Sequence, residues 1–332
     1  QFPLLVSMTR WIPVTVNWTR DCLTRSGLCQ PSSRPNWCGF RTVREKRSWG
    51  RLFRYRHSLA LRRPTKSSVV IFVVHPSTTF SSLKTLTKSS IVAIIPARYA
   101  SSRLPGKALV DLAGRPMIEH VYRRASSVPE LDAVIVATDD DRIISAVQGF
   151  GGHAERTQSI HRSGTERVAE VAARLPCAIV VNIQGDEPLI EPSMIKEALE
   201  MVRSEPSVQM CTLRRQITDP AELANPSIVK VVVDSHGDAL YFSRHKIPHS
   251  VSAVEPIFFK HIGLYVYRRH FLLELATLPP MPLETVESLE QLRVLEHGFT
   301  IRTVETKSDS FGVDTLEDVE RVRRSLTQGV RP

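Results

Sequence analysis

From residue 91 onward, the chain alternates short apolar runs with amphipathic stretches. Three runs rich in β-branched residues predict buried strands: 91–96, 133–137 and 178–183. Between the runs, apolar residues recur at helical spacing over 117–125, 141–147 and 165–174. This alternation predicts an α/β fold, with a mostly parallel sheet and helices on both of its faces.

The later pattern predicts a departure from a purely parallel sheet. Four further segments have strand composition: 208–213, 228–233, 239–243 and 261–267. "DSHGD" at 234–238 is typical of a hairpin turn, so two of these strands should pair antiparallel. We expect a mixed sheet with an antiparallel excursion.

Two helices are predicted near the carboxyl end of the chain. One covers 283–297, where Val286, Leu289, Leu292 and Leu295 form one stripe before Gly298. The other covers 315–326, with Asp314 or Thr315 as its cap. No internal repeat and no linker interrupts the pattern, so residues 91–332 are expected to form one domain.

Residues 1–90 differ in composition from the rest. They hold 16 of the 44 Lys and Arg residues but only two of the 34 acids, a net charge of +14 that leaves −4 for residues 91–332. All four tryptophans also lie there. The basic character of the chain, with its overall charge of +10, therefore belongs to this segment and is no evidence that the remainder binds nucleic acid.

Three interpretations of residues 1–90 compete. An Arg- and Ser-rich segment poor in acids fits an organellar transit peptide. A basic arm could instead contact nucleic acid or anionic lipid. We favour a third interpretation, a non-native or disordered extension, because the segment keeps no helical or strand period.

Cysteines and apolar runs exclude some classes of protein. Cys22, Cys29 and Cys38 form no C-x-x-C pair and have no histidines at zinc spacing, and Cys177 and Cys211 lie in apolar contexts. The run 69–74 is much shorter than the roughly 18 apolar residues of a membrane span. We expect no disulfide framework and no membrane insertion.

The loop after the first predicted strand is a candidate anion site. In "IIPARYASSRLPGKAL", Arg98, Arg103 and Lys107 follow the strand, at the end of an α/β sheet where ligands bind. The glycine fingerprints of dinucleotide folds and P-loop proteins are absent. Arginine forks and inward-turned backbone N–H groups suit a polyphosphate, although a solvated basic loop would have the same composition.

Two acids are candidate metal ligands. Asp186 follows a strand in "VVNIQGDEPLI", and Asp314 precedes the last predicted helix. Carboxylate oxygens are ligands of Mg²⁺ when it bridges substrate phosphates. Alone, Asp314 is explained equally well as a helix cap and Asp186 as a turn residue.

Eight segments together resemble 3-deoxy-manno-octulosonate cytidylyltransferases, the CMP-KDO synthetases of lipopolysaccharide synthesis. They are "IIPARYASSRLPGKALVDLAGRPMIEHV", "VIVATDD", "HRSGTERVAEV", "VVNIQGDEP", "ALYFSRHKIP", "HIGLYVYRRHF", "VESLEQLRVLEHG" and "GVDTLEDVERVR". The resemblance covers nearly all of residues 91–326 in order and does not reach residues 1–90. It implies a Rossmann-like nucleotidyltransferase fold.

The resemblance also implies an activity and a set of site residues. The family transfers CMP from CTP to 3-deoxy-D-manno-octulosonate (KDO), releasing pyrophosphate. By resemblance, Arg98, Arg103 and Lys107 hold the triphosphate, and Asp186 and Asp314 hold Mg²⁺. The cytosine pocket would use Ala137, Ser163 and Gly164, and the sugar would contact Gln184, Arg244, His261, Tyr265 and Glu290.

Partners and alternatives follow from the same resemblance. It implies a homodimer built around residues 228–267, and a cytoplasmic enzyme unless residues 1–90 are a transit peptide. One alternative is a CMP-sialic acid synthetase, although "YFSR", "HIGLYVY" and "LEQLR" favour the eight-carbon sugar. A non-catalytic nucleotide-binding module is a second alternative, but such a module would be expected to have lost one of the two acids.

Overall fold

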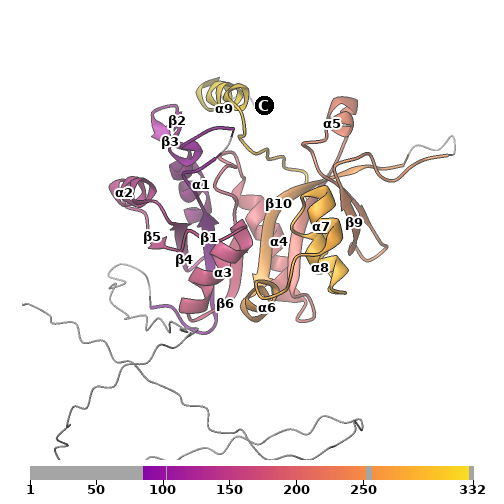
Figure 1. Ribbon diagram of the computed structural model, residues 1–332, viewed down its shortest axis with the longest axis horizontal. Helices are drawn as coiled ribbons and strands as arrows, with labels where there is room; N and C mark the ends of the chain where they lie inside the picture. The colour runs from indigo at the N-terminus through magenta and orange to yellow at the C-terminus, as the bar shows by residue number, and fades with distance from the viewer. Residues whose placement is uncertain (1–84, 102, 252–255, 329–332) are drawn as a thin grey trace, which may run out of the picture. The chain divides into compact units, whose positions relative to one another are not determined.

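The computed structural model describes residues 85–101, 103–251 and 256–328, and nine strands within these ranges form one mixed sheet (Figure 1). Its order is β11-β7-β10-β6-β1-β4-β5, and β8 and β9 extend it from β10. The strands are β1 (Ser90–Pro96), β4 (Ala133–Thr138), β5 (Ala154–Arg156), β6 (Cys177–Asn182), β7 (Met210–Gln216), β8 (Lys230–Val233), β9 (Ala239–Ser243), β10 (Phe259–Arg268) and β11 (Arg302–Glu305). A separate small hairpin pairs β2 (Asp111–Leu112) with β3 (Arg115–Pro116).

The parallel part of the sheet places β1 at its centre. β1 pairs in parallel with β4 on one side and with β6 on the other. Val92, Ile94 and Ile95 are fully buried because both faces of the strand are covered, which explains the continuous apolar run. The chain leaves β1 toward β4 and later returns to its other side as β6. This reversal forms a crevice at the carboxyl ends of the two strands, where ligands of α/β proteins bind.

The antiparallel excursion is confirmed. β10 pairs antiparallel with β6, β7 and β8, and β8 pairs antiparallel with β9. The predicted turn at 234–238 joins β8 to β9, with the N–H of Asp234 donating to the carbonyl of Asp238 at 2.9 Å. Gly237 has a φ of 83°, a conformation that favours glycine.

Helices cover both faces, as the alternation of patterns predicts. On one face lie α1 (Met117–Ser126), α2 (Asp141–Gly149) and α4 (Pro192–Ser204), whose apolar residues share a core with β1, β4 and β6. On the other lie α3 (Gly164–Arg174), α6 (Arg269–Leu275) and α8 (Leu292–Glu296). The short segments η1 (Lys107–Leu109) and α5 (Pro220–Ala224) belong to loops. The α/β fold with a mixed sheet is therefore confirmed.

The prediction of one helix over 283–297 is wrong. The structure has α7 (Pro282–Glu287) and α8, separated by a turn in which Ser288 has a φ of 53°. A left-handed residue ends a helix, so the stripe is broken after Val286. Leu289 and Leu292 are still buried, which is why the apolar spacing looked continuous.

The last helix, α9 (Leu316–Gln328), lies beside the β2–β3 hairpin (Figure 1). Of the two candidate caps, Thr315 takes the role: its hydroxyl accepts from the N–H of Asp318 at 3.2 Å. A third apolar cluster joins Leu104 of the basic loop with Val313 and Val319 around this helix. The cluster holds the basic loop and the segment that carries Asp314 against each other.

Several expectations concern residues outside the described ranges. The interpretations of residues 1–90 fall almost entirely on residues 1–84, so the boundary near residue 90 stays a prediction. In the described part of the chain, no helix combines the length and the apolar character needed to cross a membrane.

Candidate functional site

A cavity of about 380 Å³ opens beyond the carboxyl ends of β1 and β6. Five segments line it: the basic loop after β1, the start of α1, the start of α3 with the turn before it, the turn after β6, and Asp314. The lining residues are Pro96, Ala97, Arg98, Ser101, Arg103, Lys107, Ala108, Met117, His161, Arg162, Ser163, Gly164, Arg167, Gln184, Gly185, Asp186 and Asp314.

The basic loop is closed by a glycine turn. The N–H of Gly106 donates to the carbonyl of Tyr99 at 3.0 Å, and Gly106 has a φ of 70°. A Cβ at this position would also lie 3.1 Å from the Tyr99 ring. The guanidinium of Arg142 stacks on that ring at 3.2 Å from its centre. The loop therefore folds around Tyr99, and both Arg103 and Lys107 line the cavity.

Lys107 brings the two predicted metal ligands together. Its Nζ lies 2.5 Å from Oδ2 of Asp186 and 3.0 Å from Oδ1 of Asp314. Arg103 pairs with the other oxygen of Asp314 at 2.9 Å. Burial alone would lower the pKa of Lys107, but the two carboxylates outweigh this effect and raise it. Lys107 therefore stays protonated and bridges both acids.

The geometry of these acids fits a divalent cation. Because Asp186 and Asp314 contact the same ammonium, their oxygens face a single cation position. In the described residues no group of three or more His, Cys, Asp or Glu side chains could hold a metal ion. Mg²⁺ is commonly bound by one or two carboxylates together with substrate phosphates and water. The donor set therefore fits Mg²⁺ that is completed by a nucleotide.

The residues predicted for the base are placed differently from one another. Ser163 and Gly164 line the cavity at the start of α3, where Ser163 is the N-cap and accepts from the N–H of Glu166 at 3.2 Å. Ala137 lies within β4, and its carbonyl accepts from the N–H of Ala97 at 2.9 Å. Ala137 is fully buried and is not among the residues that line the cavity.

Of the residues predicted for the sugar, Gln184 alone lines the cavity. Its Nε2 donates to the carbonyl of Gly263 in β10 at 3.3 Å. His261 and Tyr265 lie on β10, where burial lowers the pKa of His261 to about 3 and raises that of Tyr265 well above its ordinary value. Both are therefore neutral at physiological pH. Arg244 instead donates to the backbone carbonyls of Pro226, Glu287 and Ser288.

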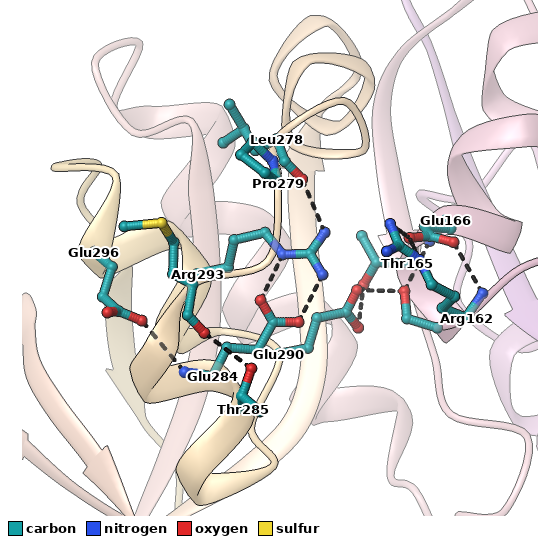
Figure 2. Close-up of polar contacts among 12 residues, drawn as sticks. Arg162, Thr165, Glu166, Leu278, Pro279, Glu284, Thr285, Glu290, Arg293 and Glu296 are labelled. Atoms are coloured by element: carbon teal, nitrogen blue, oxygen red, sulfur yellow. Dashed lines mark hydrogen bonds and ion pairs between the residues drawn. The ribbon is translucent and has the colours of Figure 1, made fainter.

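Glu290 connects the α7–α8 turn to the start of α3 (Figure 2). It accepts from the hydroxyl of Ser163 and, at 2.9 Å, from that of Thr165. Burial raises the pKa of Glu290, and the two hydroxyls oppose the shift. Behind it, buried Arg293 holds Glu284 through two hydrogen bonds of 2.7 and 2.6 Å. The predicted sugar residue thus touches the predicted base residue Ser163.

The sequence patterns indicated no role for three other basic residues that line the cavity: His161, Arg162 and Arg167. Arg167 is 5% exposed although it lies on α3 beside the buried Val168 and Val171, and it pairs with Asp139 at 3.1 Å. An arginine on the apolar face of a helix was the available signal, because such a charge is rarely buried without a partner.

Comparison with known proteins gives the family. The family model described as cytidylyltransferase matches residues 92–305, from β1 to the end of β11. The chain belongs to the cytidylyltransferase family. Its matched region contains every predicted site residue except Asp314, which lies beyond the matched end.

Curated relatives are similar over the same region. A 3-deoxy-manno-octulosonate cytidylyltransferase of Geobacter sulfurreducens is 51% identical over 248 residues, covering 71% of this chain and 99% of the relative. One from Solibacter usitatus is 52% identical over 246 residues, covering 72% and 97%. The family resemblance inferred from the motifs is confirmed.

Solved structures agree. A CMP:2-keto-3-deoxy-manno-octonic acid synthetase complexed with CTP is 47% identical, with a TM-score of 0.70 over 73% of this chain and 100% of that one. A putative glucose-1-phosphate thymidylyltransferase of Bacillus anthracis is 16% identical, with a TM-score of 0.54 over 73% of this chain and 97% of that one. The second likeness shows the fold alone, and together they confirm the predicted nucleotidyltransferase fold.

Proposed function

We propose that this chain transfers CMP from CTP to KDO and releases pyrophosphate. The observation that carries the proposal is the cavity at the ends of β1 and β6, where Lys107 and Arg103 meet Asp186 and Asp314. It lies in a chain about half identical to 3-deoxy-manno-octulosonate cytidylyltransferases along nearly their whole length. These cations suit a triphosphate, and the acids suit the metal that would accompany it.

The central difficulty of this reaction is charge, because an anionic sugar acid must approach a polyanion. Arg98, Arg103 and Lys107 would hold the triphosphate and stabilise the negative charge that develops on the leaving pyrophosphate. Arg98 is exposed and forms no ion pair among the described residues, so its guanidinium is available to a ligand. Charge stabilisation and positioning are the contributions that such a site can make.

Asp186 and Asp314 would hold Mg²⁺ at the position that Lys107 now contacts. When bound, Mg²⁺ supplies charge neutralisation at the phosphate and lowers the pKa of a coordinated hydroxyl. The two aspartates would fix its place between the basic loop and the turn after β6. Gly185 supports that turn, since its lack of a side chain lets it approach the carbonyl of Pro96.

The sugar would enter beside Gln184, between the metal position and β10. Neutral His261 and Tyr265 suit hydroxyl groups rather than a carboxylate. Glu290 and Arg244 would act from the wall behind the cavity, because both already have protein partners. The base would lie near Ser163 and Gly164 at the start of α3. Ala137 would support that pocket from within β4.

Pyrophosphate release from CTP and KDO tests the proposal. We expect turnover with this pair and much slower release when sialic acid replaces KDO or when ATP, GTP or UTP replaces CTP. Asp186→Asn and Asp314→Asn should each lower turnover on the order of a thousandfold, about 4 kcal/mol of barrier, while the thermal transition stays close to that of the parent. Preference for sialic acid would indicate the nine-carbon enzyme, and CTP binding without turnover would indicate a non-catalytic module.

We also propose that the chain acts as a homodimer. Support comes from exposed apolar side chains around the antiparallel excursion: Leu240 is 60% exposed, Ile257 61% and Val286 81%. Among the described strands, β9, which carries Leu240, pairs with β8. On its other side, the N–H of Ala239 donates to the carbonyl of Ile301, and the described strands leave the rest of that edge, beyond Ala239, without a partner strand. Light scattering should report a dimer, and Leu240→Arg should shift it to the monomer; a monomeric parent protein would contradict this proposal.

The family resemblance further supports a role in lipopolysaccharide biosynthesis and a cytoplasmic location. If residues 1–90 act as a transit peptide, the location would be an organelle instead of the cytoplasm. Expression of the full chain and of residues 91–332, each fused to a fluorescent protein, would distinguish the two locations.

A further inference from the structure

The segment that brings Asp314 to the cavity has no helix or strand of its own. It spans residues 306–315 between β11 and α9, and we call it the strap. The N–H of Thr306 donates to the carbonyl of Arg214 at 2.9 Å at one end. At the other end, the backbone N–H of Asp314 donates to the carboxylate of Asp318 at 3.0 Å. Between these ends, the position of the strap depends on contacts with other segments.

One contact of the strap joins it to the turn that carries Asp186. The hydroxyl of Ser310 donates to Oε2 of Glu187 at 2.8 Å, and both residues are buried, with 5% and 8% of their surface exposed. Close by, the N–H of Val313 donates to the carbonyl of Asp186 at 2.9 Å. A buried hydrogen bond of this kind holds its partners firmly, because breaking it leaves a polar atom without water.

Glu187 is also part of the turn that presents Asp186. Its N–H donates to the carbonyl of Gln184 at 3.2 Å and closes the turn 184–187, in which Asp186 is the third residue. On its other side, the carboxylate faces Gly263, where an added Cβ would lie 3.4 Å from Oε1. The backbone of Glu187 therefore fixes Asp186, while its side chain fixes the strap.

We propose that Glu187 and Ser310 are positioning residues that set the separation of the Asp186 and Asp314 carboxylates. The inference rests on the proposed function, since it assumes that these two acids hold the metal. Glu187 and Ser310 do not line the cavity, so they act through the two aspartates. Loss of groups that orient metal ligands typically weakens metal binding by roughly 10–100-fold.

Other contacts of the strap provide a matched control. The hydroxyl of Ser308 donates to Glu191 at 2.9 Å, and this bond lies farther along the strap from Asp314. Ser308→Ala and Ser310→Ala remove the same group from the same segment, and neither changes a charge. A role that is only structural would make the two variants similar in metal affinity.

The test measures Mn²⁺ binding by the paramagnetic resonance signal of free Mn²⁺, in the presence of α,β-methylene-CTP. We expect Ser310→Ala to weaken Mn²⁺ binding at least tenfold and Ser308→Ala to change it less than twofold. Ser310→Cys keeps the volume and a weak donor, so it should be intermediate, and it serves as the decisive variant if Ser310→Ala does not fold. Binding of the nucleotide without metal should be unchanged in all three.

The outcomes separate this inference from the proposed function. Absence of Mn²⁺ binding by the parent protein would overturn the metal proposal itself. If the parent binds Mn²⁺ and Ser310→Ala binds it equally well, with only a lower melting temperature, the serine is structural and the positioning role is wrong.

Discussion

Replacement of Lys107 by methionine should strengthen metal binding in the absence of nucleotide. The ammonium of Lys107 occupies the position between Asp186 and Asp314, at 2.5 and 3.0 Å from their oxygens. A divalent cation that binds there must displace it. Methionine keeps much of the length of the side chain and removes the competing charge.

The contacts of Lys107 set the size of this effect. Hydrogen bonds between charged groups contribute about 1.5–3 kcal/mol each, whereas exposed ion pairs contribute about 0–1 kcal/mol. The Lys107 side chain is 16% exposed, and those of Asp186 and Asp314 are 31% and 38% exposed, so we take about 1–1.5 kcal/mol for each contact. The two together give about 2–3 kcal/mol, or a metal dissociation constant roughly 30–150-fold lower in the variant.

Isothermal titration of the nucleotide-free protein with Mn²⁺ measures this constant directly. Arg98→Met is the matched control, because Arg98 lines the same cavity, carries the same charge and contacts neither acid. We expect Arg98→Met to change the Mn²⁺ affinity only slightly, because it removes one positive charge from the cavity but no contact with either acid. Equal Mn²⁺ affinities of the parent and Lys107→Met would show that Lys107 does not compete with the metal. An equal gain in Lys107→Met and Arg98→Met would show that the loss of one positive charge explains the effect. With CTP and KDO, Lys107→Met should turn over more slowly because a phosphate contact is lost.

Three further predictions concern other parts of the site. Gly185→Ala places a Cβ 2.8 Å from the carbonyl of Pro96 and should cost about 1–3 kcal/mol of stability, measured by urea unfolding; an unchanged midpoint would show that the two strand ends separate freely. Because the pKa of His261 is lowered to about 3 in the fold from 6.5, its contribution to stability is complete above about pH 6.5 and is lost as pH falls toward 3. His261→Asn should therefore flatten the pH dependence of unfolding in that window, and a parallel curve would contradict the shift. Arg103→Ala should lower kcat and weaken CTP binding while KDO affinity changes less, and Arg103→Lys should recover only part, whereas unchanged CTP kinetics would make this loop ordinary surface.

The sequence was sufficient for the central sheet because its strands are buried on both faces. Residues 91–96 predict a strand, and β1 spans Ser90–Pro96. A continuous apolar run bounded by turn residues has few other solutions. The prediction of one helix over 283–297 was wrong because a helical stripe of apolar residues does not reveal a left-handed residue such as Ser288.

The sequence predicted part of the residue set that lines the candidate site, but not how those residues are arranged. Strand ends and a basic loop suggested Lys107, Asp186 and Asp314 separately. Lys107 and Asp186 are 79 positions apart in the chain, and Lys107 and Asp314 are 207 positions apart. No local sequence pattern encodes contacts over such separations. Glu187 lies in the motif "VVNIQGDEPLI", but the sequence indicates no role for it. Its proposed role depends on a hydrogen bond from Ser310, which lies more than a hundred residues away in the chain.

The bonds of Glu290 imply that the two proposed halves of the site, one for the nucleotide and one for the sugar, share a wall. Ser163 caps α3 by accepting from the N–H of Glu166, and the proton of the same hydroxyl is donated to Glu290. Thr165 supplies a second donor to that carboxylate. A ligand that displaces Glu290 from either hydroxyl must also disturb the first turn of α3, where Ser163 and Gly164 line the cavity. If a bound sugar contacts Glu290 as proposed, its binding should therefore change the base side of the site through this one hydrogen-bonded residue.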